Sequence, residues 1–135
     1  MENKKILIVD DDYDMRIFVS TVVETNGFEP LTAQDGVEAL ERAKSSHPAL
    51  VILDVMMPKI EDGILTYKQF KTDENLSSIP IIMLSAIAKK TFLHSIRALN
   101  PQKSDLIPDP EAYMEKPLDA DELASIIKSI LKNKK

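Results

Sequence analysis

The sequence predicts an α/β fold: a single doubly wound, five-stranded parallel sheet with five helices. Short apolar runs alternate with amphipathic segments five times along the chain, which is typical of the strand–helix repeats that build a parallel sheet. One of these runs, Ala49 to Leu53, is apolar without a break, as expected for a strand buried on both faces. The 135 residues suffice for one such domain and leave no room for a second.

The first strand and helix lie near the N-terminus. Ile6 to Val9 is a short apolar run, and the acidic triplet Asp10 to Asp12 follows it. The next segment repeats apolar side chains at intervals of three and four, as one buried face of a helix requires. These side chains are Met15, Phe18, Val19 and Val22. Asp12 or Asp14 is expected to cap the start of this helix, and Gly27 its end.

The second strand is weaker than the first. Pro30 interrupts Phe28 to Ala33, so this strand is expected near an edge of the sheet. A second helix opens at Asp35–Gly36 and ends at His47–Pro48. Its inner face is expected to carry Val37, Leu40 and Ala43.

The central strand ends in Asp54, and two more strand–helix units are expected after it. A loop is predicted from Met57 to Gly63, before a third helix. Ile64, Leu65 and Phe70 are expected to face inward from that helix. Ile81 to Leu84 is the fourth strand, and Ser85 stands at its carboxyl end. The fourth helix, Lys89 to Leu99, is expected to align Phe92, Ile96 and Leu99.

The last part of the chain contains an irregular segment and a final strand–helix pair. Asn100 to Pro110 carries three prolines and is predicted to be an exposed excursion. Ala112 to Met114 is the last strand, and Lys116–Pro117 follows it. The last helix, Asp119 to Lys132, opens with a variant of the capping box. Its apolar stripe is Leu123, Ile126, Ile127, Ile130 and Leu131.

Composition excludes several classes of function. The net charge of −5 argues against a general nucleic-acid binder, and the absence of cysteine excludes disulfides and thiolate metal sites. The longest apolar runs are too short to cross a membrane. Lys4 and Lys5 give the N-terminus a basic start, but the apolar run that follows is short and meets three acids, unlike a signal peptide. We therefore expect a cytoplasmic protein without membrane insertion or direct nucleic-acid contact.

Four of the five expected strands lead into a polar group, and the carboxyl ends of parallel strands meet at one edge of a sheet. These groups are Asp10 to Asp12, Asp54, Ser85 and Lys116. Crowded carboxylates repel by about 4 kcal/mol per pair at ~4 Å and an effective dielectric near ~20, which indicates a bound cation. Hard oxygen ligands suit Mg²⁺ or Mn²⁺. A hydroxyl and an ammonium group nearby match the needs of a transferred phosphoryl group.

Each of these groups, taken singly, also has a purely structural explanation. An acidic triplet is commonly a solvated loop, and Asp54 or Ser85 could simply cap a turn or a helix. Lys116–Pro117 could be only a turn. Their shared position at one edge of the sheet is what indicates a functional site.

Five short motifs follow one another over essentially the whole chain. They are Val9 to Asp12, Leu53 to Pro58, Asp62–Gly63, Ser85–Ala86, and Tyr113 with Lys116–Pro117. With these motifs in this order, the chain resembles the response-regulator receiver domains of two-component signalling, the CheY-like family with its flavodoxin-like fold. The resemblance implies the strand order 2-1-3-4-5 and a single receiver domain over residues 1–135 without an output domain.

The resemblance also implies roles for the acidic residues. Asp54 would be the phosphoacceptor, taking its phosphoryl group from a sensor histidine kinase or a phosphotransfer protein. Mg²⁺ would be held by Asp10, Asp11, Asp54 and the backbone carbonyl of Met56, with Asp11 bound directly and Asp10 through a water. The chain would be a signalling module with slow self-phosphorylation and self-dephosphorylation rather than an enzyme.

The remaining roles concern the switch. Ser85 and Lys116 would contact the phosphoryl group, and Tyr113 would be the aromatic residue whose rotamer reports the switch. The peptide bond before Pro117 is implied to be cis. The face formed by the fourth helix, fifth strand and fifth helix would then control a downstream protein.

Two departures from the family pattern stand out. The loop from Pro58 to Gly63 is one residue longer than usual, so either Glu61 or Asp62 takes the usual acidic position. The chain between Ser85 and Lys116 is also longer, and the excess falls around Asn100 to Pro110, which is expected to reshape the partner-binding face.

Two other functions remain open from the sequence. One is a phosphohydrolase of the haloacid-dehalogenase type, whose Asp-x-Asp motif is formally matched by Asp10 and Asp12 but which usually carries a cap domain. The other is a receiver-like scaffold that is never phosphorylated, although the acceptor, the acidic pair, the hydroxyl and the lysine are all present.

Overall fold

The computed structural model describes residues 4–57, 59–99 and 109–132, in which strands and helices alternate. The elements are β1 (Lys5–Val9), α1 (Tyr13–Thr25), β2 (Glu29–Ala33), α2 (Gly36–Ser46), β3 (Leu50–Asp54), α3 (Ile60–Thr72), β4 (Ile81–Ser85), α4 (Lys89–Leu99), β5 (Ala112–Glu115) and α5 (Ala120–Lys132). All strand pairs are parallel, and the sheet order is β2-β1-β3-β4-β5. The predicted fold class and strand order are confirmed.

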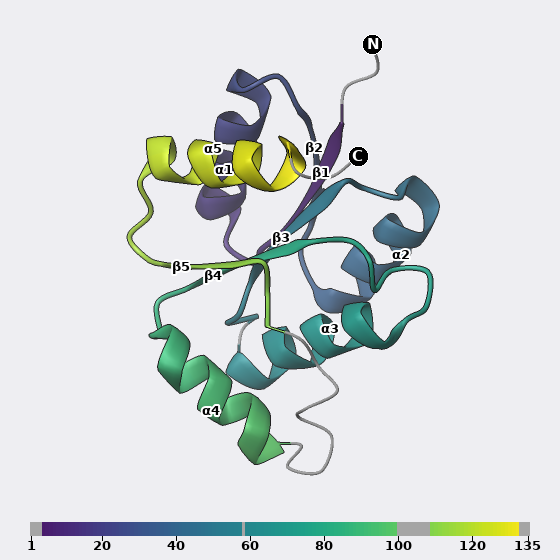
Figure 1. The fold of residues 1–135 in the computed structure, drawn as a ribbon, viewed down its shortest axis with the longest axis vertical. Helices are drawn as coiled ribbons and strands as arrows, with labels where there is room; N and C mark the ends of the chain where they lie inside the picture. The colour runs from purple at the N-terminus through teal and green to yellow at the C-terminus, as the bar shows by residue number, and fades with distance from the viewer. Residues whose placement is uncertain (1–3, 58, 100–108, 133–135) are drawn as a thin grey trace.

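Helices cover both faces of the sheet (Figure 1). One buried cluster packs Ile8 and Ile52 of the strands against α1 and α5, through side chains such as Val19 and Ile127. A second cluster lies on the opposite face, where the strands meet α2, α3 and α4. Because side chains alternate between the faces of a strand, β3 contributes to both clusters and all five of its residues are buried. This explains its unbroken apolar sequence.

The expected caps of α1 are present. Asp12, not Asp14, is the N-cap, and its carboxylate accepts a 3.0 Å hydrogen bond from the backbone N–H of Asp14. Gly27 follows the C-cap residue with a φ of 89°, a conformation that glycine adopts without a steric penalty. β2 is an edge strand, as the interrupting proline predicted.

The loop predicted from residue 57 to residue 63 is wrong at its C-terminal end, since α3 already begins at Ile60. The carboxylate of Asp62 accepts a 3.1 Å hydrogen bond from the N–H of Lys59, and the N–H of Asp62 donates to the carbonyl of Lys59 at 3.0 Å. Asp62 therefore supports the start of the helix. Gly63 lies in the first turn, where a Cβ atom would overlap the backbone carbonyl of Val55. The glycine thus permits close packing of α3 on the end of β3 rather than ending a loop.

Two residues expected in the core are exposed instead. Val37 is 71% exposed and Leu65 is 54% exposed, and both line a cleft of about 270 Å³ between α2 and α3. A helix turns by about 100° per residue, so each lies outside the arc of its buried neighbours. Phe18, at 37% exposure, is likewise only partly covered. Ile64 and Phe70 are buried as predicted.

Most of the excursion predicted for residues 100–110 lies outside the described residues. Asp109 is exposed, but Pro110 is buried, so the expected exposure is wrong at that position. Phe92 is fully buried as expected, whereas the side chains of residues 96 and 99 are not among those described. The peptide bond between Lys116 and Pro117 is cis. Within the described ranges, no helix combines the length and apolar character that a membrane span needs.

Candidate functional site

Four strands bring polar groups to one edge of the sheet. Asp10 follows β1, Asp54 ends β3, Ser85 ends β4 and Lys116 follows β5. Main-chain hydrogen bonds continue past the strands and hold these ends in place. The N–H of Lys116 donates to the carbonyl of Ser85 at 2.7 Å, and the N–H of Asp10 donates to the carbonyl of Ala33 at 3.1 Å. The predicted convergence of these residues is therefore present.

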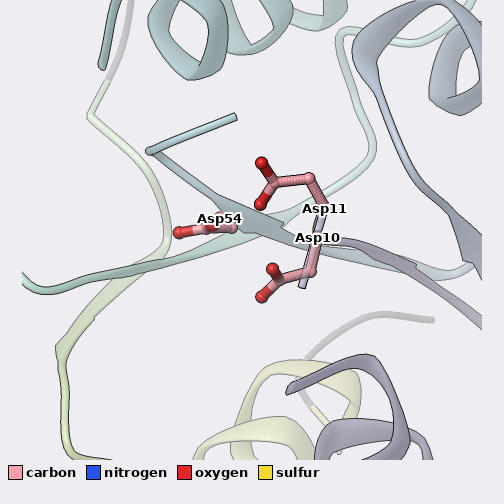
Figure 2. A group of neighbouring side chains, drawn as sticks. All are labelled: Asp10, Asp11 and Asp54. Carbon is pink, nitrogen blue, oxygen red and sulfur yellow. The ribbon is translucent and has the colours of Figure 1, made fainter. Parts of the chain in front are cut away.

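Three carboxylates form the centre of this edge. Each of Asp10, Asp11 and Asp54 places an oxygen within 4.8 Å of the others, and Figure 2 shows the three groups directed to the same side. Asp10 and Asp54 are buried, with 2% and 3% exposure, whereas Asp11 is exposed. The Oδ2 atom of Asp10 is buried without a hydrogen-bond partner. An unsatisfied buried acceptor is costly, so the cluster is suited to bind a positive charge.

The ionisation of these carboxyl groups is strongly perturbed. Burial, more than any other effect, raises the pKa of Asp54 to about 7, and the charge of Asp10 also acts to raise it, while Lys116 acts to lower it. Burial is also the largest cause of the raised pKa of Asp10. A cation bound among these oxygens would favour their charged forms.

Lys116 is the basic residue that reaches the cluster from β5. Its Nζ lies 3.4 Å from Oδ1 of Asp54 and 4.0 Å from Oδ2 of Asp10. One ammonium group cannot balance three ionised carboxylates. The remaining charge and the all-oxygen donor set fit a divalent cation such as Mg²⁺.

Ser85 and Tyr113 lie beside the cluster and share a neighbour. The buried Oγ of Ser85 accepts a 3.0 Å hydrogen bond from the N–H of Ile87, and the hydroxyl of Tyr113 donates to the carbonyl of Ile87 at 2.9 Å. Burial raises the pKa of Tyr113, and a hydrogen bond with Ser85 partly opposes this. The two predicted switch residues are thus linked to each other. Their contact with a phosphoryl group stays a prediction.

Met56 lies two residues after Asp54, the last residue of β3. Its N–H donates to Oδ1 of Asp54 at 3.3 Å, and its side chain is 40% exposed. The expected role of its carbonyl as a metal ligand stays a prediction.

Arg16 was missed by the sequence reasoning. It is the fourth residue of α1, and its Nη1 donates a 2.7 Å hydrogen bond to the carbonyl of Asp10. A basic residue one helical turn after the acidic triplet is the signal that could have identified it, because such a side chain can reach back to the helix start.

Comparisons with known proteins identify the family. The family model described as "Response regulator receiver domain" matches residues 6–128. The alkaline phosphatase synthesis transcriptional regulatory protein PhoP of Bacillus subtilis is 36% identical over 130 residues, which are 96% of this chain and 49% of PhoP. The polar-differentiation response regulator DivK of Brucella ovis is 33% identical over 129 residues, 95% of this chain and 96% of DivK. This chain thus spans about half the length of the transcriptional regulators that it matches.

Solved structures agree with the sequence comparisons. The chemotaxis protein CheY4 of Vibrio cholerae matches with a TM-score of 0.78 and 26% identity, over 96% of this chain and 99% of CheY4. The signal receiver domain of a histidine kinase from Syntrophus aciditrophicus matches with a TM-score of 0.79 and 26% identity, over 98% and 92% of the two chains. Fold, site geometry and sequence together show that this chain belongs to the response-regulator receiver domain family.

Proposed function

We propose that this protein is a phosphorylation-controlled switch whose acceptor is Asp54. The observation that carries the proposal is the setting of this carboxylate at the end of the central strand. It is buried, it lies in a cluster with two other carboxylates, and it is 3.4 Å from the ammonium group of Lys116. The phosphoryl donor is a phosphohistidine on a sensor kinase or a phosphotransfer protein, by analogy with the family.

The transfer is a single displacement at phosphorus. An oxygen of Asp54 attacks the phosphorus atom and forms an O–P bond, while the P–N bond to the donor imidazole breaks and its electron pair stays on the nitrogen. The donor imidazole carries a proton on its other ring nitrogen, so it leaves as a neutral histidine, and the second product is an aspartyl phosphate. The attacking carboxylate must be ionised, and Lys116 favours that form because it acts to lower the pKa of Asp54.

The carboxylates of Asp10, Asp11 and Asp54, together with the carbonyl of Met56, are the proposed holders of Mg²⁺, for which Mn²⁺ can substitute. When bound, the cation supplies positive charge to the carboxylates and to the oxygens of the transferred group. The buried Oδ2 atom of Asp10, which accepts no hydrogen bond, supports this assignment.

The new charge on Asp54 is the signal. Lys116 pairs with one phosphoryl oxygen and Ser85 donates a hydrogen bond to another. The side chain of Tyr113 moves together with Ser85, because its hydroxyl donates a hydrogen bond to the carbonyl of Ile87 and the N–H of Ile87 donates to Ser85. Ser85 ends β4 and Tyr113 lies in β5, so movement of these side chains alters the face formed by α4, β5 and α5. The downstream protein is proposed to bind to this face.

We infer that the switch acts on a separate downstream protein. This inference is supported by DivK, because nearly its whole length matches this chain, whereas PhoP is about twice as long as the matched segment. A blot of cell extract tests this, since a receiver without an output domain gives a band at 15.2 kDa. The cytoplasmic location stays a prediction. The match to the receiver family over residues 6–128 favours the switch over the phosphohydrolase alternative.

Incubation with phosphoramidate and Mg²⁺ tests the proposal. The intact protein should gain the mass of one phosphoryl group, and hydroxylamine should remove it. Asp54→Asn should abolish the gain. Asp12→Asn is the matched control and should retain it, because Asp12 caps α1. The assignment fails if the Asp54→Asn variant gains the same mass at the same rate. Absence of any gain in the wild type supports the scaffold alternative, and turnover of p-nitrophenyl phosphate supports the phosphohydrolase.

A further inference from the structure

Arg16 connects α1 to the acidic loop, defined as residues 10–12. The side chain is partly buried, and its Nη1 donates to the carbonyl oxygen of Asp10 at 2.7 Å. The guanidinium carbon lies 5.7 Å from the centre of the Tyr13 ring. A cation over an aromatic face is attracted by the ring quadrupole. Tyr13 therefore helps to hold the guanidinium group where it meets the acidic loop.

The bonded carbonyl belongs to the peptide group that joins Asp10 to Asp11. A peptide group is planar, so fixing its oxygen fixes the plane that contains the Cα atoms of both residues. Asp10 itself has two more restraints. Its N–H donates to the carbonyl of Ala33 at 3.1 Å, and its Oδ1 accepts from the N–H of Asp12 at 2.9 Å. Arg16 adds the restraint that acts on the link to Asp11.

Arg16 exerts this restraint without occupying a carboxylate. Its bonded partner is a neutral carbonyl, and among the described residues the ion pairs to Asp10 and Asp54 come from Lys116. The carboxylate oxygens of the cluster, including Oδ2 of Asp10, which accepts no hydrogen bond, therefore stay available to a cation.

We propose that Arg16 is a positioning residue for the cation site. By holding the carbonyl of Asp10, it orients the peptide between Asp10 and Asp11 so that both carboxylates reach one cation together with Asp54. The inference rests on the proposed function, since it requires that the acidic cluster binds Mg²⁺.

The test compares Mg²⁺ binding by the wild type and three variants. Isothermal titration calorimetry with MgCl₂ gives the dissociation constant of the wild type, Arg16→Gln, Arg16→Lys and Arg42→Gln. Arg42 is the matched control because it is an exposed arginine paired with Glu38 at 3.6 Å on α2, and its replacement removes the same charge. A salt concentration of ~0.15 M limits the reach of that charge to about 8 Å. Amide spectra of the metal-free proteins report the orientation of the peptide at Asp11.

Loss of an outer partner of a metal ligand typically weakens binding by about 10- to 100-fold. We expect Arg16→Gln to weaken Mg²⁺ binding by about tenfold or more, to shift the amide signal of Asp11 in the metal-free state, and to recover the wild-type phosphorylation rate at saturating Mg²⁺. Arg42→Gln should bind Mg²⁺ like the wild type. Equal weakening by both variants, or wild-type affinity in Arg16→Gln, would overturn the inference.

Arg16→Lys covers the case in which the Gln variant does not fold. Lysine keeps the charge and the helix propensity but lacks the planar fork of arginine. It should also weaken Mg²⁺ binding, by a smaller factor, and wild-type affinity here would again refute the positioning role. If the wild type itself takes up no Mg²⁺, the proposed cation site fails. If the wild type binds and the Arg16 variants bind equally well, only the present inference fails.

Discussion

At the scale of the residue, opposing influences meet on Asp54. Burial and the charge of Asp10 disfavour its ionised form, while Lys116 and the N–H of Met56 favour it. The balance leaves its pKa at about 7, well above the ordinary value of 3.8. A group with a pKa near neutral pH is only partly charged there, so binding of a cation at the proposed site would release a proton.

This balance makes the metal-free protein sensitive to pH. Because the folded-state pKa of Asp54 is raised from 3.8 to about 7, its protonated form favours the folded state, so its contribution to stability is full below about pH 4. That contribution is lost as the pH rises to about 7. The free energy of unfolding in EDTA should therefore fall over this interval by more than about 1 kcal/mol, since one pKa unit corresponds to about 1.4 kcal/mol. Urea titrations at several pH values measure it.

Asp54→Asn provides the control, because an amide does not titrate. This variant should show a flatter dependence of stability on pH between about 4 and 7. If the profile of the Asp54→Asn variant runs parallel to that of the wild type, Asp54 is not the group responsible.

At the scale of the element, the start of α3 depends on Gly63. In an exposed helix, replacing glycine by alanine stabilises by about 0.5–1 kcal/mol. In α3 the added Cβ would meet the main-chain carbonyl of Val55, directly after β3, and main chain cannot move aside as a flexible side chain can. Replacing Gly63 with alanine should therefore lower the free energy of unfolding instead of raising it.

We expect Gly63→Ala to destabilise the fold by about 1–3 kcal/mol, the usual range for an overpacked core. Urea unfolding measures this. Gly27→Ala is the comparison: its φ is 89° but nothing lies within 4 Å of the added atom, so it should cost only about 1–2 kcal/mol of backbone strain. A Gly63→Ala variant as stable as the wild type would mean that α3 packs less closely on β3.

The elements themselves were largely predictable from the sequence, for a physical reason. A short, unbroken apolar run is typical of a strand whose two faces are both covered by helices. β1, β3 and β4 each contain such a run. Helix faces were harder to assign. Val37 and Leu65 are apolar and sit one or two positions from buried residues, but the rotation of the helix turns them to the cleft between α2 and α3. The start of α3 had a local signal in Asp62, whose carboxylate accepts from the N–H of Lys59, whereas the close approach of Gly63 to Val55 depends on tertiary packing.

At the scale of the whole molecule, the proposed cation site would link the stability of the fold to cation binding. Mg²⁺ at about 100 times its dissociation constant should stabilise the protein by about 2.7 kcal/mol if it binds only the folded state. Asp11→Asn should abolish this gain and also stabilise the metal-free protein, because it relieves repulsion among the three carboxylates. Thermal unfolding with and without Mg²⁺ measures both effects.

Asp12→Asn is again the matched control, since Asp12 belongs to the same acidic loop but caps α1. This variant should keep the stabilisation by Mg²⁺. A wild-type melting temperature that does not respond to Mg²⁺, or an Asp11→Asn variant that responds fully, would contradict a cation site at this cluster.

The site was predictable to the extent that topology determines it. A parallel sheet brings the ends of its strands to one edge, so the meeting of Asp10, Asp54 and Lys116 followed from their positions in the sequence. The hydrogen bond from Arg16 to Asp10 and the shared contact of Ser85 and Tyr113 with Ile87 depend on side-chain rotamers. Those rotamers are set by packing between elements and not by the sequence pattern.

The ion pair between Lys116 and Asp54 spans 62 positions of the chain, and β1 lies between β2 and β3 in the sheet. A contact between residues so far apart in the sequence can form only after the entropy of closing the intervening chain has been overcome. During synthesis, a ribosome exposes Asp54 well before it exposes Lys116. An unfinished chain therefore carries Asp54, the proposed acceptor, without its basic partner Lys116. Under the proposed function, a chain could accept a phosphoryl group only once its tertiary structure is complete, and a partly made or locally unfolded copy would lack the assembled site.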